Sequence, residues 1–166
     1  MKTIWLNPFS ESSISNCIAE LEAYKKSLSD KCIKLIEIMC REGEEYAITR
    51  WAQHIWSGET AESVMGYREG NVGVISVGGN AIWIEFGTGV YTAGYSYPAP
   101  LPDGISIHGA YGKSANDPNG WTYFDKFTGD FYHTHGHIGD PIMWETARKL
   151  EEEAHKYAKE AFNGTV

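Results

Sequence analysis

Apolar residues recur at alternating intervals of four and three over residues 10–42, the spacing of a helix with one apolar stripe. The stripe comprises Ile14, Ile18, Leu21, Lys25, Leu28, Cys32, Leu35 and Met39. Ser10 or Ser13 can cap its first turn, and Gly43 is expected to end or kink the helix. Most amphipathic helices face their own core, so we expect this stripe to face a sheet of the same chain. The alternative is that it also packs on a neighbouring subunit.

A second, shorter helix is expected over residues 44–56, so that the helical part spans 10–57. From residue 60 to 87 the pattern changes to period two, which predicts three short strands near 61–68, 73–77 and 81–86. The intervening sequences Glu69-Gly70-Asn71 and Gly78-Gly79-Asn80 are typical of tight turns.

The third predicted strand has two faces because alternate residues of a strand point to opposite sides. Its buried face would carry Ile82, Ile84 and Phe86. The opposite face would carry Ala81, Trp83 and Glu85.

The segment 88–120 shows little periodicity and is rich in Gly, Tyr and Pro, which predicts a long irregular loop. A hairpin is expected over 121–135, around Thr128-Gly129. A C-terminal helix is expected over 140–162, with Asp140 as its cap and Pro141 in its first turn. Together the elements predict one α+β domain over 1–166, in which the long N-terminal and the C-terminal helix pack on an antiparallel sheet.

The charge of the chain argues against one class of function, the binding of nucleic acid. The chain has 22 acidic and 14 basic residues, a formal charge of -8, and Lys113 is the only basic residue between Glu69 and Asp125. Gripping nucleic acid by its phosphates needs clustered basic residues, so specific DNA binding is not expected. No apolar run has the length of a signal peptide or a membrane span. Cys17, Cys32 and Cys40 are expected to be reduced thiols of a cytosolic product.

Two segments resemble motifs of nucleotide-binding proteins or hydrolases, but each lacks a feature that the motif requires. Gly109–Ser114 is too short for a phosphate-binding loop, and Gly94–Pro98 lacks the closing glycine of a nucleophile elbow. We therefore expect no catalytic residue and no cofactor. The alternative is a metal-dependent enzyme in which His133, His135 and His137, on alternate positions of a strand, bind zinc. Gly136 would interrupt that strand, so a role at the surface or in an interface is favoured.

Aromatic side chains of the loop suggest contacts with protein. Tyr and Trp anchor protein interfaces, whereas base stacking needs a basic groove that this loop lacks. With the outer face of the third strand included, the expected interface residues are Trp83, Glu85, Tyr91, Tyr95, Tyr97, Tyr111 and Trp121.

Two segments carry a resemblance. Trp83-Ile84-Glu85-Phe86-Gly87-Thr88-Gly89 is followed, about fifty residues on, by Thr134-His135-Gly136-His137-Ile138-Gly139-Asp140-Pro141-Ile142-Met143. This pairing resembles small neck or tail-completion proteins of long-tailed bacteriophages and their prophages. The resemblance implies a structural virion protein without catalytic activity, made in the host cytoplasm.

Such proteins form rings around the DNA channel, commonly with sixfold symmetry, and contact other neck and tail proteins. DNA passes through without being specifically bound, which suits an acidic chain. The long loop and the two histidines of the second segment depart from the family pattern. They leave open a relative at a different position in the neck, such as a tail terminator or a head-closure protein. A bacterial binding module unrelated to phage is a separate alternative.

Overall fold

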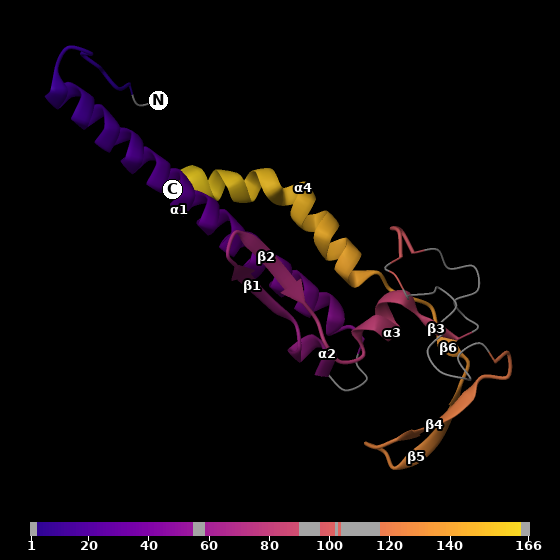
Figure 1. Ribbon diagram of the computed structural model, residues 1–166. Coiled ribbons are helices and arrows are strands. Elements are labelled where there is room, and N and C mark those ends of the chain that lie inside the picture. Colours follow the sequence, from indigo (N-terminus) through magenta and orange to yellow (C-terminus); the bar gives the residue numbers. More distant parts are fainter. Residues whose placement is uncertain (1–2, 55–58, 90–96, 102, 104–116, 164–166) are drawn as a thin grey trace.

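The structure is a computed structural model that describes residues 3–54, 59–89, 97–101, 103 and 117–163 (Figure 1). It is an α+β protein, as predicted. Its main helices are α1 (Glu11–Trp51) and α4 (Ile142–Asn163). Both were predicted, although α1 replaces two expected helices.

Helix α1 begins at Ser10, whose side chain accepts a hydrogen bond from the Ser13 amide at 3.4 Å. It continues without a break through Gly43, so the prediction that this glycine ends or kinks the helix is wrong. Gly43 is buried inside α1, and a Cβ there would overlap the end of the Ile75 side chain. The glycine therefore provides room for close packing instead of a stop signal.

The first hairpin packs on the second half of α1. It follows a short helix, α2 (Glu59–Glu62), and consists of β1 (Met65–Glu69) and β2 (Val72–Ser76), paired antiparallel in the register Glu69↔Val72. Gly70 in its turn has φ 59°, a left-handed conformation that glycine adopts without strain. The predicted turn at residues 69–71 is confirmed.

The third predicted strand is wrong: residues Ala81–Phe86 form a helix, α3. Positions four apart share a helical face, so Ala81 and Glu85 are both buried in α3. Ile82, expected inside, is exposed, whereas Phe86 is buried as expected. A six-residue apolar run has no reliable period, and here the helical form is the one that brings Glu85 to the core.

The remaining strands form two separate pairs instead of extending one sheet. The short strands β3 (Thr88–Gly89) and β6 (Gly136–His137) pair antiparallel. The predicted hairpin over 121–135 is confirmed as β4 (Trp121–Asp125) and β5 (Asp130–Thr134). We call β4 and β5 with their turn the hairpin tip.

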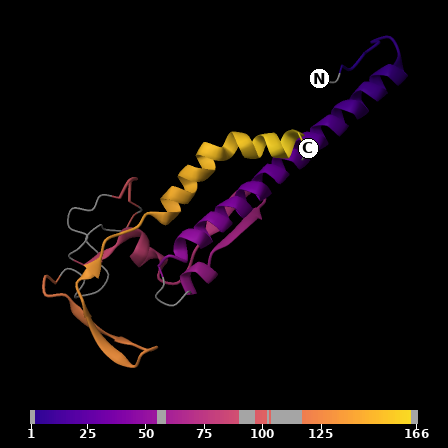
Figure 2. The same ribbon diagram turned by 180° about the vertical axis from the view of Figure 1, so that it is seen from behind.

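Two apolar clusters form the core. One contains Ala47, Trp51, Val64, Ala81 and Ile142, and the other joins α1 to α4 through Ile38, Tyr157 and Ala161. Both lie on the second half of α1. Figures 1 and 2 show that the first half of α1 extends away from this core and that the hairpin tip projects at the opposite end.

Candidate functional site

The two segments that carry the family resemblance meet in one place. We call residues 84–89 with 136–144 the joint. Its centre is Glu85, which is 4 % exposed and accepts hydrogen bonds from the backbone amides of Met143 at 2.9 Å and Trp144 at 3.2 Å. These are orphan amides of the first turn of α4, so Glu85 caps that helix from a distant part of the chain.

Burial raises the pKa of Glu85, while the hydrogen bonds from Met143, Tyr97 and Trp144 lower it in part. Because removal from water penalises the charged form of a carboxyl group, the net direction is upward. Glu85 was expected on an exposed face and in an interface. It is instead an internal cap, and that expectation is wrong.

Asp140 has a different role from the predicted cap. Its carboxylate receives the Arg50 guanidinium at 3.0 Å and lies 2.8 Å from His54 Nε2. Arg50 also pairs with Glu145 at 2.9 Å. The Asp140 amide donates to the Ile84 carbonyl at 2.8 Å. These contacts tie the end of α1 to the start of α4 and to α3.

Glycines allow the two chain segments of the joint to cross. Gly89 and Gly136 are partners in the β3–β6 pair, with φ of 69° and 95°. A Cβ at Gly89 would overlap the carbonyl of His135, and one at Gly136 would overlap the carbonyl of Thr88. Both positions therefore require glycine for conformation and for space. The glycines of the two resembling segments therefore serve the fold, because they let the two chain segments cross at the β3–β6 pair.

Three of the other predicted interface residues are described by the structure and lie in or beside this joint. The Tyr97 hydroxyl donates to Glu85 at 2.6 Å, and its ring lies 4.7 Å from that of Phe86. Trp121 is half-buried beside Gly89, and Trp83 is half-buried in α3. Tyr91, Tyr95 and Tyr111 lie outside the described residues. Tyr97 thus serves the joint itself.

The structure brings two of the three histidines together. The rings of His133 and His135 are 5.1 Å apart, edge to face. His133 Nε2 lies 2.7 Å from the carbonyl oxygen of Asn119, and His137 Nδ1 lies 2.9 Å from that of Ile138. Gly136, with its positive φ, separates the third ring from the other two. Within the described part of the chain no three His, Cys, Asp or Glu side chains are grouped to hold a metal.

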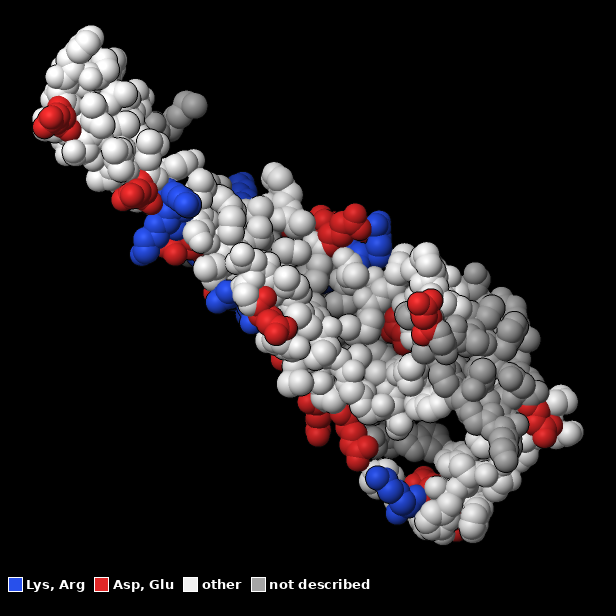
Figure 3. All heavy atoms as spheres, in the orientation of Figure 1, with Lys and Arg blue, Asp and Glu red and all other residues white. Residues whose placement is uncertain are grey.

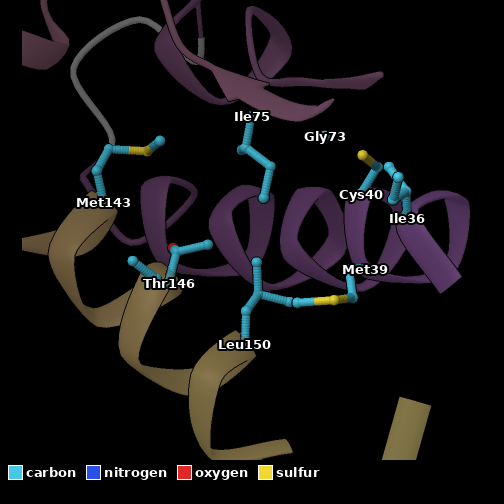
Figure 4. Close-up of a pocket in the computed structure, with 9 residues that line it drawn as sticks. Ile36, Met39, Cys40, Gly73, Ile75, Met143, Thr146 and Leu150 are labelled. Atoms are coloured by element: carbon cyan, nitrogen blue, oxygen red, sulfur yellow. The ribbon is translucent and has the colours of Figure 1, made fainter. Parts of the chain in front are cut away.

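One apolar cavity of about 300 Å³ lies between α1, β2 and α4 (Figure 4). Its polar groups already serve the fold. Thr146 donates to the Ile142 carbonyl at 2.8 Å, and the Cys40 thiol donates to the Tyr67 carbonyl at 3.1 Å. A ligand site needs a few polar groups that converge on the ligand. This cavity offers no such arrangement, and we interpret it as a packing gap.

Exposed aromatic residues of the hairpin tip are a surface that sequence reasoning missed. Phe131 is 74 % exposed, and its ring lies 5.1 Å from that of Phe124, directly across the strands. Phe127 in the turn is also exposed. Phenyl groups on both sides of a predicted turn are the available sequence signal, because residues equidistant from a hairpin turn face each other.

A second exposed apolar surface lies on the first half of α1. We call residues 11–30 the arm. Ile18 and Leu21 are each 52 % exposed, and every residue from 21 to 30 is exposed. The expectation that the whole stripe faces the protein's own core is wrong for the arm. Trp5 and Phe9, just before the arm, are exposed as well.

No described helix is both long and apolar enough to cross a membrane. Comparisons of the chain with models of known protein families, with curated proteins and with solved structures give no match.

Proposed function

We propose that this protein is a structural component of a bacteriophage neck or tail. In this role it joins or completes the tail at the head–tail interface and assembles with copies of itself as a ring around the DNA channel. The identity rests on the resemblance of residues 83–89 and 134–143 to neck and tail-completion proteins. The assembly role rests on the chain's surfaces.

One observation carries the assembly role: the chain holds two apolar surfaces away from its core, at opposite ends (Figure 1). Apart from its base, where Trp121 lies beside Gly89 of β3, the hairpin tip packs mainly within its own two strands. An isolated two-stranded hairpin is marginally stable in water, and exposed aromatic rings are typical anchors of protein interfaces. A contact with another protein would both cover these rings and fix the hairpin.

The joint gives the hairpin tip a fixed base. The glycine crossing and the Glu85 cap tie the strands that precede and follow the tip to α3 and α4. A ring needs a head-to-tail contact between two different surfaces of neighbouring copies. We assign the hairpin tip to one side of that contact. The formal charge of -8 suits a channel wall from which DNA is repelled.

The proposal is tested by measuring the mass of purified protein at several concentrations by native mass spectrometry and sedimentation velocity. We expect a closed ring of one stoichiometry that contains more than two copies. Phe124→Ser with Phe131→Ser should abolish it while leaving the circular dichroism spectrum unchanged, because both side chains are exposed. Thr122→Ser, on the same strand, is the matched control and should assemble normally.

If no ring forms at high concentration, with or without a tail-tube protein, the proposal that this protein assembles as a ring is wrong. Full assembly of the double Phe variant would overturn the role of the hairpin tip. Genes for portal, capsid and tail-tube proteins next to its own gene would support the phage assignment, and their absence would count against it.

A further inference from the structure

The arm is a helical surface that its own chain leaves uncovered. Helix α4 covers the second half of α1 and ends near the middle of it (Figure 1). The contact of Lys31 with the Phe162 ring, 6.0 Å from Nζ to the centroid, lies at that boundary. Beyond it, the described part of the chain places no element against Leu28, Leu21, Ile18 or Ile14, all of which are exposed.

The uncovered positions continue a seam that already holds a helix. Along α1, residues 14, 18, 21, 25, 28, 32, 35 and 39 alternate at four and three, the heptad spacing of helix–helix contacts. At one end of the seam Leu35 and Met39 pack with α4. The same spacing runs on through the arm. The missing partner of the arm is therefore another helix.

Charge along the arm identifies the partner and its direction. Residues 11–24 contain Glu11, Glu20 and Glu22 and no basic residue. Residues 25–34 contain Lys25, Lys26, Lys31 and Lys34 against Asp30 alone. Figure 3 shows this order, with acidic side chains toward the free end of α1 and basic ones behind them.

A parallel pair of arms would place like charges side by side and would set Lys25 against Lys25 in the seam. An antiparallel pair instead places the acidic half of each arm along the basic half of the other, twice over. In an antiparallel pair a heptad position a faces a position d, so Lys25 would lie beside a leucine of the partner. There its ammonium can reach out to water along its own methylene stem.

We propose that the arm binds the arm of a second copy of this chain as an antiparallel two-helix coiled coil. The overlap runs over residues 11–34, a length of roughly 36 Å at the helical rise of about 1.5 Å per residue. The overlap takes in residues 31–34 beyond the arm, where α4 ends beside Lys31 while Cys32 and Lys34 remain exposed to a partner. The core of each copy lies beyond an opposite end of the pair. This contact uses one surface twice, whereas a ring contact uses two different ones. It is independent of the phage assignment and leaves the hairpin tip for the ring.

The seam is tested with Leu21→Lys and Leu28→Lys together, in protein that also carries Phe124→Ser and Phe131→Ser so that only the arm contact is measured. The control carries Ala23→Lys and Ser27→Lys, which add the same charge to the arm away from the seam. Sedimentation equilibrium should find a dimer in the parent. The seam variant should raise its dissociation constant about 100-fold or more, because four leucines in the pair lose their burial. The control should raise it only a few-fold, through added charge.

The direction is tested by electron–electron resonance with one spin label per chain, after Cys17→Ser and Cys32→Ser; Cys40 is buried and not labelled. Labels at Ser12 should lie roughly 30 Å or more apart along the pair, because axial separation in an antiparallel pair grows by about 3 Å per residue from its centre. Labels at Ala23 lie near that centre but on the outer faces of the two helices, so we expect them closer together, roughly 15–25 Å apart. Short distances at both sites would show a parallel pair and overturn the proposal. A monomer at all concentrations, or equal weakening by the seam and control variants, would also overturn it.

Discussion

The apolar stripe of α1 has opposite surroundings at its two ends. At the end nearer the core, Leu35 and Met39 are partly buried against the cluster that joins α1 to α4. In the arm, Ile18 and Leu21 remain half exposed at equivalent spacing. A heptad pattern shows that a helix needs a partner along one side. It does not show whether that partner belongs to the same chain.

The largest expected difference between the halves concerns burial. Trp51→Ala should lower the free energy of unfolding by about 3–5 kcal/mol, because it removes a fully buried ring and leaves a cavity. Leu21→Ala in the arm should change it by less than about 0.5 kcal/mol in dilute monomer, since an exposed side chain loses little contact. Urea unfolding at a concentration below dimerisation measures both. A comparable loss at the two positions would show that the arm is covered within its own chain.

The second difference concerns how closely other elements approach the two halves of α1. Gly66 of β1 lies against this half, and a Cβ there would overlap the Cys40 backbone carbonyl. Gly66→Ala should therefore destabilise the protein by about 1–3 kcal/mol, because backbone cannot move aside as a side chain can. Gly78→Ala is the control. Its Cβ would lie an ordinary 3.6 Å from Ser63, and we expect a change within about 0.5 kcal/mol in thermal unfolding.

The third difference is smaller and concerns how much each helix cap contributes to the free energy of unfolding. Glu85→Ala leaves two buried amides of α4 without an acceptor and should cost about 2 kcal/mol. Ser10→Ala removes a local and partly exposed cap of the arm and should cost less than about 1 kcal/mol. Equal, small effects in chemical unfolding would show that the first turn of α4 finds other acceptors.

The smallest effect is the pH dependence that Glu85 contributes. Its folded pKa is raised, so its contribution to stability is full below the ordinary carboxyl pKa of 4.5 and declines as the pH rises through the folded value. The free energy of unfolding of the parent relative to Glu85→Gln should therefore be larger at pH 4 than at pH 7. Urea titrations at the two pH values measure it.

Glu153 on α4 contributes a pH dependence of stability with the opposite sign. Hydrogen bonds from Tyr157, Lys149 and Lys156 lower its pKa to about 2, so its contribution is present above pH 4.5 and declines as the pH falls toward 2. For Glu85, the opposite result is a difference in free energy of unfolding between the parent and Glu85→Gln that grows from pH 4 to pH 7. It would show that the hydrogen bonds lower the Glu85 pKa by more than burial raises it.

The sequence by itself determined the elements whose pattern is long or whose turns are specific. The stripes of α1 and α4 repeat over several turns, and Gly70 and Gly129 each mark a hairpin turn with positive φ. Local geometry is sufficient in these places, because periodicity and turn chemistry act over a few residues. The α+β class and the N-terminal cap at Ser10 follow from the same local rules.

Only the tertiary structure decided the elements whose form depends on distant partners. Residues 81–86 are too short to hold a period, and they become helix α3, in which Glu85 meets the amides of Met143 and Trp144. Gly43 reads as a stop in sequence but is kept inside α1 because Ile75 and Leu150 pack where its side chain would be. Neither contact is visible in sequence, because the residues involved lie tens of positions apart. The same limit hid the exposed arm, since a stripe has the same spacing whether or not the chain folds back to cover it.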